Sequence, residues 1–180
     1  MKLTTKTIIF FDGDGTLWYP KATKHSQKPH WVYYESSTMN DYLQHLVVIP
    51  GVTQTLRQLR KLGIITILVS THPHRAKEAD SVLKEKVRHF GLEKLFNEVH
   101  AARNVESGKG DVILRVLKRL KLSKNSALMV GDSYKWDYLA AKNVGIDCVL
   151  MNTDYLKKTS GAGRVKRIII NMQGISKYLA

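Results

Sequence analysis

The sequence is poor in cysteine, in acidic residues and in long apolar runs. A single cysteine, Cys148, excludes an internal disulfide framework and a zinc site made of several cysteines, and it fits a reducing compartment. No stretch approaches the roughly 18 consecutive apolar residues of a membrane-spanning helix. The apolar run at residues 8–11 is too short for the core of a signal peptide. These absences predict a cytoplasmic protein with no membrane contact.

Acidic residues number 15 against 29 lysines and arginines, which gives a formal net charge of +14. Such an excess attracts anions, so phosphorylated ligands and nucleic acid are candidate partners. The basic residues are spread over several predicted helices, and a surface of ordinary solvated lysines also explains them. The length of 180 residues and the hydrophobic content of 43% fit a single domain, residues 1–180, with a substantial core.

The rest of the chain is organised around residues 7–17, whose sequence is TIIFFDGDGTL. Four apolar residues lead into Asp12 and Asp14, and a glycine then allows a sharp turn. A buried strand would deliver both carboxylates to its carboxyl end, where ligands bind in open α/β sheets. Carboxylates this close repel each other unless a cation, a shared proton or strong donors compensate. An Asx-rich turn without function is the simpler alternative.

Two further predicted strands end in polar residues. The strand at 64–69 is followed by Ser70 and Thr71, and the strand at 127–130 is followed by Gly131 and Asp132. Hydroxyls and another carboxylate therefore arrive at strand ends, as the first pair of acids does.

Lys109 stands at the predicted start of a helix that continues through residue 120. A cation is unusual there, because the helix dipole favours an anion at this end. A helix N-terminus together with an ammonium group makes a good phosphate site. In a chain with 29 lysines and arginines, chance also explains a lysine at this position. Lys118 is the alternative candidate for the phosphate-binding lysine.

The remaining pattern predicts a flap with a linker helix at 18–48 and an edge strand with a helix at 152–180. The other expected elements are helices at 36–46, 52–62, 76–90 and 137–145, and strands at 98–101, 147–151 and 168–170. The basic residues near 157–167 leave a docking loop as a second interpretation of the C-terminal segment.

Aromatic residues crowd the predicted flap, at Trp18, Tyr19, Trp31, Tyr33 and Tyr34. They either stack on a ring of the substrate or form a small satellite core under the flap. Residues 72–75, with the sequence HPHR, are expected near the mouth of the site. Their two histidines lack an evident third metal ligand and are interpreted as loop residues.

Residues 12–17, DGDGTL, match the DxDGT signature of the haloacid dehalogenase-like (HAD) hydrolase superfamily. The GDx4D arrangement that joins Asp132 to Asp137 resembles a second motif of that superfamily, and the ends at Ser70 and Lys109 resemble its two other motifs. The resemblance covers roughly residues 7–151. It implies an α/β fold, a Rossmann-like three-layer sandwich with a mainly parallel central sheet.

The resemblance implies a phosphatase that works through an aspartyl-phosphate. Asp12 would be the nucleophile, and Asp14 would protonate the leaving oxygen and later deprotonate the attacking water. Dehalogenases of the superfamily lack an acid at the second position and its P-type ATPases carry Thr there, so Asp14 favours a phosphatase. Gly13, Ser70 and Lys109 would hold the phosphoryl group, with Thr71 as the alternative to Ser70.

The same resemblance implies Mg²⁺ as the cofactor. Its ligands would be the Asp12 side chain, the Asp14 backbone carbonyl and Asp132, while Asp137 would hold a metal-bound water. Magnesium prefers oxygen ligands and keeps several waters, so a few carboxylates and a substrate phosphate suffice.

The gaps between Asp12, Ser70 and Lys109 are too short for a large cap domain. We therefore expect an open site like that of the magnesium-dependent phosphatase branch, suited to a bulky or macromolecular substrate or to a lid from a neighbouring subunit in an oligomer. The sequence predicts a Mg²⁺-dependent phosphomonoesterase. A nucleic-acid-binding protein on the same scaffold and a HAD phosphotransferase are the alternatives.

Overall fold

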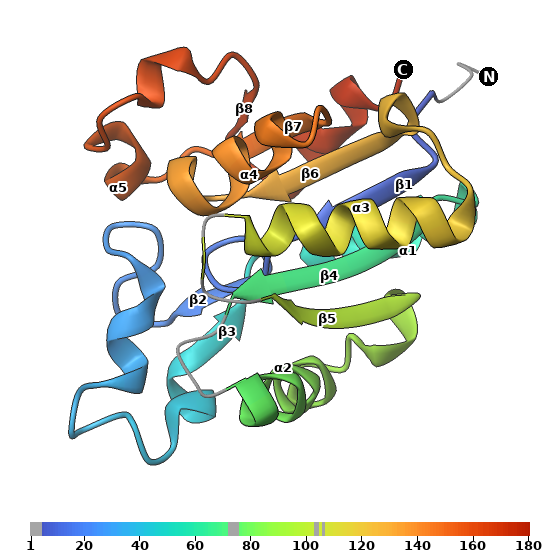
Figure 1. Cartoon of the computed structure of the whole chain (residues 1–180). Helices are drawn as coiled ribbons and strands as arrows, with labels where there is room; N and C mark the ends of the chain where they lie inside the picture. Colours follow the sequence, from blue (N-terminus) through green and yellow to red (C-terminus); the bar gives the residue numbers. More distant parts are fainter. Residues whose placement is uncertain (1–4, 72–75, 103–104, 106) are drawn as a thin grey trace.

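A computed structural model describes residues 5–71, 76–102, 105 and 107–180. Its central feature is a parallel sheet of six strands in the order β5-β4-β1-β6-β7-β8 (Figure 1). The strands span Ile8–Phe11 (β1), Ile65–Thr71 (β4), Glu98–Ala102 (β5), Ala127–Gly131 (β6), Asp147–Met151 (β7) and Ile168–Ile169 (β8).

Strand β1 lies inside the sheet, paired with β4 on one side and β6 on the other. All four of its side chains are buried, because helices cover both faces of the sheet. Ile8 and Phe10 pack on one face, and Ile9 and Phe11 pack on the other. This explains why the strand is a continuous apolar run rather than an alternating one.

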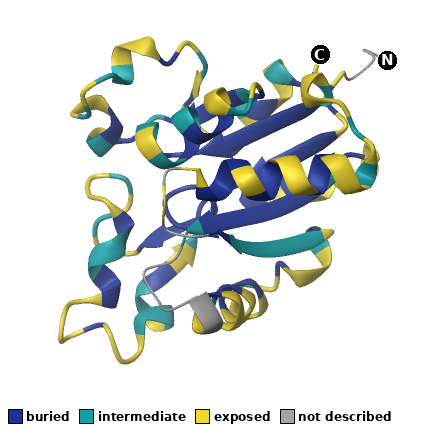
Figure 2. Ribbon diagram, viewed as in Figure 1, coloured by how far each residue is buried: buried dark blue, intermediate teal, exposed yellow. Residues whose placement is uncertain are grey.

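The helices form the two outer layers. One face is covered by α1 (Val52–Lys61), α2 (Ala76–His89) and the 3₁₀ helix η7 (Met172–Tyr178), and the other by α3 (Gly108–Leu120) and α4 (Ala140–Asn143). In Figure 2 the inner strands β1, β4 and β6 are mostly dark blue, the edge strand β5 is mostly teal, and α3 alternates between buried and exposed residues. The predicted three-layer α/β sandwich is therefore confirmed.

The flap contains a second, two-stranded sheet. Trp18–Pro20 (β2) pairs antiparallel with Leu46–Val48 (β3), and the segment between them carries the 3₁₀ helices Pro29–Tyr33 (η1) and Tyr42–His45 (η2). In Figure 1 this segment lies beside the carboxyl ends of the central strands.

The helix predicted at 36–46 is wrong. Residues 36–41 form turns, and β3 takes up the apolar end of the predicted helix. The Thr38 hydroxyl donates to the carbonyl oxygen of Val32 at 2.8 Å, which favours a turn over a continuing helix. Pairing with β2 then draws Leu46 into the core, where it is 2% exposed.

Most of the flap aromatics belong to the core. Trp18 is fully buried and stacks on Phe90 of the segment after α2, with ring centroids 5.5 Å apart. Tyr19 and Tyr33 are also buried, whereas Tyr34 is 65% exposed. The packing therefore favours the interpretation that the flap aromatics form a core under the flap rather than a stacking surface for a substrate.

The C-terminal segment adds β8 to one edge of the central sheet and then forms the 3₁₀ helix η7. Two short helices precede β8, namely α5 (Asp154–Lys157) and the 3₁₀ helix η6 (Ala162–Arg164). Short 3₁₀ helices η3 (Glu93–Leu95) and η4 (Lys124–Ser126) lead into β5 and β6, and a π-helix (Tyr134–Leu139) precedes α4. Within the described part of the chain, every helix is too short or too polar to cross a membrane.

Replacing Phe10 by alanine should lower the free energy of unfolding by about 3–5 kcal/mol, because a fully buried ring of the central strand would leave a cavity. Chemical denaturation measures this. Leu62→Ala is the control, since Leu62 is 54% exposed and its loss should cost less than about 0.5 kcal/mol. Equal losses for the two variants would contradict the assigned core.

Candidate active site

The strand order places three polar strand ends and one helix start together. Strands β4, β1 and β6 are neighbours and parallel, so their carboxyl ends meet at one edge of the sheet. Asp12 follows β1, Asp132 follows β6, and Ser70 closes β4. Helix α3 begins at Gly108, which brings Lys109 to the same edge.

Asp12 is held by two donors. Ser70 Oγ donates to Asp12 Oδ1 at 2.8 Å, and Lys109 Nζ lies 2.7 Å from the same oxygen. Burial opposes the charge on Lys109, but the carboxylates of Asp12 and Asp137 outweigh it and raise the pKa of this lysine above its usual value. The two donors therefore fix the rotation of the Asp12 carboxylate.

Asp137 joins Lys109 to the loop after β6. Its Oδ1 lies 2.5 Å from Lys109 Nζ, and its Oδ2 accepts the backbone N–H groups of Asp132 at 3.0 Å and Ser133 at 2.9 Å. Both oxygens of this fully buried carboxylate are thus engaged. Gly131 makes the approach possible, since a Cβ there would lie 2.2 Å from Asp137 Cγ.

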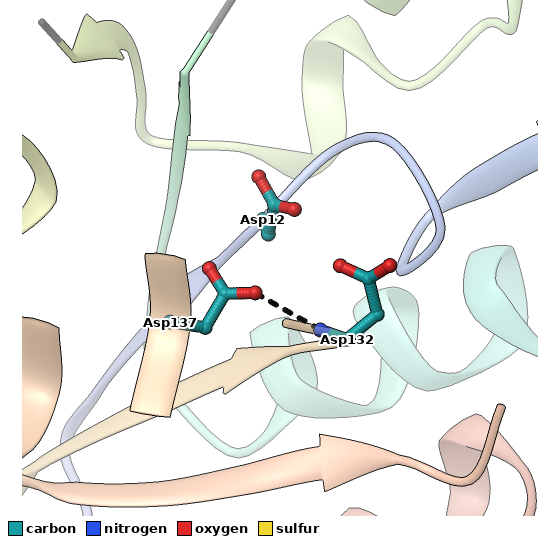
Figure 3. Close-up of side chains that lie close together, drawn as sticks. All are labelled: Asp12, Asp132 and Asp137. Atoms are coloured by element: carbon teal, nitrogen blue, oxygen red, sulfur yellow. Dashed lines mark hydrogen bonds between the residues drawn. The ribbon is translucent and has the colours of Figure 1, made fainter. Parts of the chain in front are cut away.

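Asp132 lies in a strongly anionic setting. Burial, followed by the charges of Asp12 and Asp137, raises its pKa well above the usual value for a carboxyl group. Tyr155 from α5 donates its hydroxyl to Asp132 Oδ2. Figure 3 shows Asp132, Asp12 and Asp137 gathered around one space.

The three carboxylates suit a divalent cation. Ligand oxygens of Asp12, Asp132 and Asp137 lie within 4.8 Å of one another. Among the described residues, Lys109 is the cation that contacts them, so three negative charges face one positive charge. An all-oxygen set favours a hard ion such as Mg²⁺. Since both oxygens of Asp137 are engaged, Asp12 and Asp132 are the better direct ligands.

Asp14 lies two residues further on and is 3% exposed. Its Oδ1 accepts from Trp18 Nε1 at 2.7 Å and from Tyr33 Oη at 2.6 Å. Lys86 Nζ lies 3.2 Å from Oδ2. These partners come from the flap and from α2, whereas the partners of Asp12 come from β4 and α3.

A cavity of about 170 Å³ opens over these groups. It is lined by Asp12, Asp14, Thr71 and Asp132 from the strand ends, by Lys109 from the start of α3, by Lys28, Pro29 and His30 from the flap, by residues 133–136, and by Tyr155 and Thr159. The walls around the acids are therefore basic and aromatic, which suits an anionic ligand.

The structure brings together the predicted residues Asp12, Asp14, Ser70, Lys109 and Asp132, with Asp137 beside Lys109. Gly13 is close enough that an added Cβ would lie 3.2 Å from Ser70 Oγ. Thr71 lines the cavity, whereas Ser70 is buried against Asp12. Lys118 is exposed on the outer side of α3, away from the cavity.

Sequence reasoning missed Lys86, Tyr155 and the roles of Trp18 and Tyr33. A lysine at position 86 occupies the apolar face of its helix between Leu83 and Val87, and this was the one local signal of a buried charge. Residues 72–75, expected near the mouth of the site, lie outside the described residues.

The sequence of this chain resembles those of known proteins. The family model described as haloacid dehalogenase-like hydrolase matches residues 11–151, so the chain belongs to this family. A phosphoglycolate phosphatase of Pseudomonas savastanoi pv. phaseolicola is 30% identical over 111 residues, which cover 61% of this chain and 38% of that protein. Haloacid dehalogenase-like hydrolase domain-containing protein 3 of Xenopus laevis is 27% identical over 123 residues, 67% of this chain and 46% of that protein. The chain therefore matches less than half the length of these curated relatives.

Solved structures of low sequence identity share the fold. A haloacid dehalogenase-like family hydrolase of Streptococcus pneumoniae has a TM-score of 0.71 at 17% identity, covering 99% of this chain and 100% of that chain. A HAD-superfamily hydrolase of Geobacter sulfurreducens has a TM-score of 0.67 at 15% identity, covering 98% of both chains. These matches support the HAD-like fold that the motifs predicted.

Replacing Gly131 by alanine should lower the free energy of unfolding by about 2 kcal/mol or more, because the methyl group would displace Asp137 from Lys109 and from two backbone N–H groups. Thermal and chemical denaturation measure the loss. The matched control is Gly163→Ala, where an added Cβ meets nothing within 4 Å and should change stability by less than about 0.5 kcal/mol. A neutral Gly131→Ala variant would contradict the site geometry.

Proposed function

We propose that this chain is a Mg²⁺-dependent phosphatase that hydrolyses phosphomonoesters through an aspartyl-phosphate on Asp12. The observation that carries the proposal is the contact of Lys109 with Asp12 at the floor of a cavity lined by acids and basic residues. Membership of the HAD-like hydrolase family and similarity to phosphoglycolate phosphatases support it.

In the first step, an Asp12 carboxylate oxygen attacks phosphorus and the bond to the ester oxygen breaks. Asp14 gives the leaving oxygen its proton, so an alcohol departs and an acyl phosphate remains on Asp12. Lys109 neutralises charge between the nucleophile and the phosphoryl group, because two anions would otherwise repel. Ser70, or Thr71, which lines the cavity, would donate to a phosphoryl oxygen.

In the second step, Asp14 takes a proton from a water molecule, which attacks the phosphorus of the acyl phosphate. Inorganic phosphate leaves and the Asp12 carboxylate is restored. Bound Mg²⁺ would supply Lewis-acid stabilisation of charge on the phosphoryl oxygens. Asp12 and Asp132 would hold the ion with the Asp14 carbonyl, and Asp137 would keep Lys109 and the loop after β6 in place.

The proposal also includes a single domain over residues 1–180, a cytoplasmic location and a relationship to the magnesium-dependent phosphatase branch. The phosphorylated substrate would be bulky, or a second subunit would supply a lid over it. Phosphoglycolate belongs in a first substrate panel, since several relatives carry its name.

Replacing Asp12 by asparagine should reduce hydrolysis of p-nitrophenyl phosphate in the presence of Mg²⁺ by at least about 1000-fold, because the amide cannot form the acyl phosphate. EDTA should remove the activity of the unchanged protein. Asp41→Asn is the matched control, as Asp41 is exposed and pairs with His45 outside the cavity. Full turnover by Asp12→Asn would overturn the proposed mechanism.

A second candidate function, binding of nucleic acid, is favoured by one surface feature. A hollow of about 600 Å³ near the start of β7 and β8 is lined by Tyr138, Lys142, Arg164, Lys166 and Arg167. Arg167 pairs with Asp147, whereas Lys142, Arg164 and Lys166 are exposed cations. Such a group attracts polyanions without regard to sequence.

If this hollow binds nucleic acid, changing Lys142, Arg164 and Lys166 together to glutamate should weaken binding and make the slope of log affinity against log salt shallower by about 3. Fluorescence anisotropy with single-stranded and double-stranded oligonucleotides measures this. The control changes the exposed Lys61, Lys84 and Lys94 in the same way. An equal loss in both triple variants would indicate that only the net charge attracts nucleic acid.

A further inference from the structure

Three side chains that do not come from the ends of the central strands contact the carboxylate of Asp14. Trp18 Nε1 and Tyr33 Oη donate to Oδ1 at 2.7 and 2.6 Å. Lys86 Nζ lies 3.3 Å from Oδ1 and 3.2 Å from Oδ2, and it also donates to the Tyr33 hydroxyl. We call Trp18, Tyr33 and Lys86 the Asp14 clamp.

The three members of the Asp14 clamp come from three separate elements. Trp18 belongs to β2, Tyr33 closes η1, and Lys86 lies on α2. Each is nearly or fully buried, at 0%, 8% and 0% exposed. The clamp therefore fastens the flap to α2 with Asp14 between them.

Lys86 is the unusual member. Its ammonium group is fully buried, 4.3 Å from the centroid of the Tyr33 ring. Burying a lysine is costly unless a charge and hydrogen-bond acceptors compensate, and an apolar residue at this helix position would fill the core without that cost. Burial accordingly lowers the pKa of Lys86, opposed by Asp14. Packing alone therefore does not explain a lysine at this position.

Asp14 supplies such a reason, because this residue lines the cavity while its carboxylate is held by the clamp. A side chain that transfers a proton must stay within hydrogen-bond reach of the reacting oxygen. A free carboxylate turns about its χ2 angle, a broad and soft torsion. Donors on both oxygens, from elements that are themselves packed in the core, remove that freedom.

We propose that Lys86, together with Tyr33 and Trp18, is a positioning residue that fixes the Asp14 carboxyl group, which carries the proton to be transferred to the leaving oxygen. This inference rests on the proposed phosphatase function and adds residues that the superfamily motifs do not contain. Lys86 is not among the described residues that line the cavity, and it pairs with Asp14, so its effect on the reaction passes through Asp14.

A purely structural role for the clamp makes a different prediction. If Lys86 only fills and neutralises the core, its loss should lower stability and slow all substrates by the same factor. If it positions Asp14, its loss should slow only reactions whose leaving oxygen needs a proton. The dependence on the leaving group therefore separates the two roles.

The test compares kcat/KM for p-nitrophenyl phosphate and phenyl phosphate, two esters of similar size. This quantity reports the steps through cleavage of the ester bond, and nitrophenolate leaves without the help of an acid far more readily than phenolate does. In Lys86→Met the value for phenyl phosphate should fall at least about 10-fold more than the value for p-nitrophenyl phosphate. Lys84→Met, on the exposed face of the same helix, should leave both unchanged.

Tyr33→Phe carries the test if Lys86→Met does not fold, because it removes one donor to Asp14 and keeps the buried ring. It should show the same selective loss for phenyl phosphate. In an Asp14→Asn background, Lys86→Met should add no further selective loss, since it acts through Asp14.

Equal losses on both esters in Lys86→Met and Tyr33→Phe would overturn the positioning role and leave the clamp as a structural feature. A different outcome tests the function itself. If the unchanged protein turns over neither ester in an Mg²⁺- and Asp12-dependent way, the proposed phosphatase fails, and the positioning role fails with it.

Discussion

Mutual repulsion among Asp12, Asp132 and Asp137 is the constraint on which the site depends. Their oxygens lie within 4.8 Å of one another in a buried setting, where like charges are costly. Lys109 relieves part of this repulsion through contacts of 2.7 Å to Asp12 and 2.5 Å to Asp137. The rest is what a divalent cation would relieve. A fold that buries these three carboxylates together is therefore suited to bind a metal ion and an anionic ligand.

The order of the strands in the sheet brings these acidic groups together. Strands β4, β1 and β6 are adjacent, so one edge collects a hydroxyl, two carboxylates and the start of α3. Small residues permit the approach, as at Gly131, where a side chain would collide with Asp137. The proposed catalytic groups thus stand at strand ends and at a helix start, while the flap and α5 add Lys28, His30 and Tyr155 to the lining of the cavity.

The flap does more than cover the site. Its aromatic residues enter the core, and two of them, Trp18 and Tyr33, also donate to Asp14. The same burial raises the pKa of Tyr33 well above its usual value, with Asp14 as the next cause, so the phenol stays a donor at neutral pH. The position of the second acid is therefore coupled to the folding of the flap.

Local sequence determined the parts of this protein that depend on neighbours along the chain. Apolar runs followed by Asp12, Ser70 or Asp132 indicated strands and their ends, because strand periodicity and turn chemistry are local. The stretch at 36–46 was misjudged as a helix, since only pairing with β2 makes its end a strand. Lys86 meets Asp14 across 72 positions of the chain. Such contacts come from the packing of α2 and the flap on the sheet, which no local pattern encodes, so only the tertiary structure decided what surrounds the second acid.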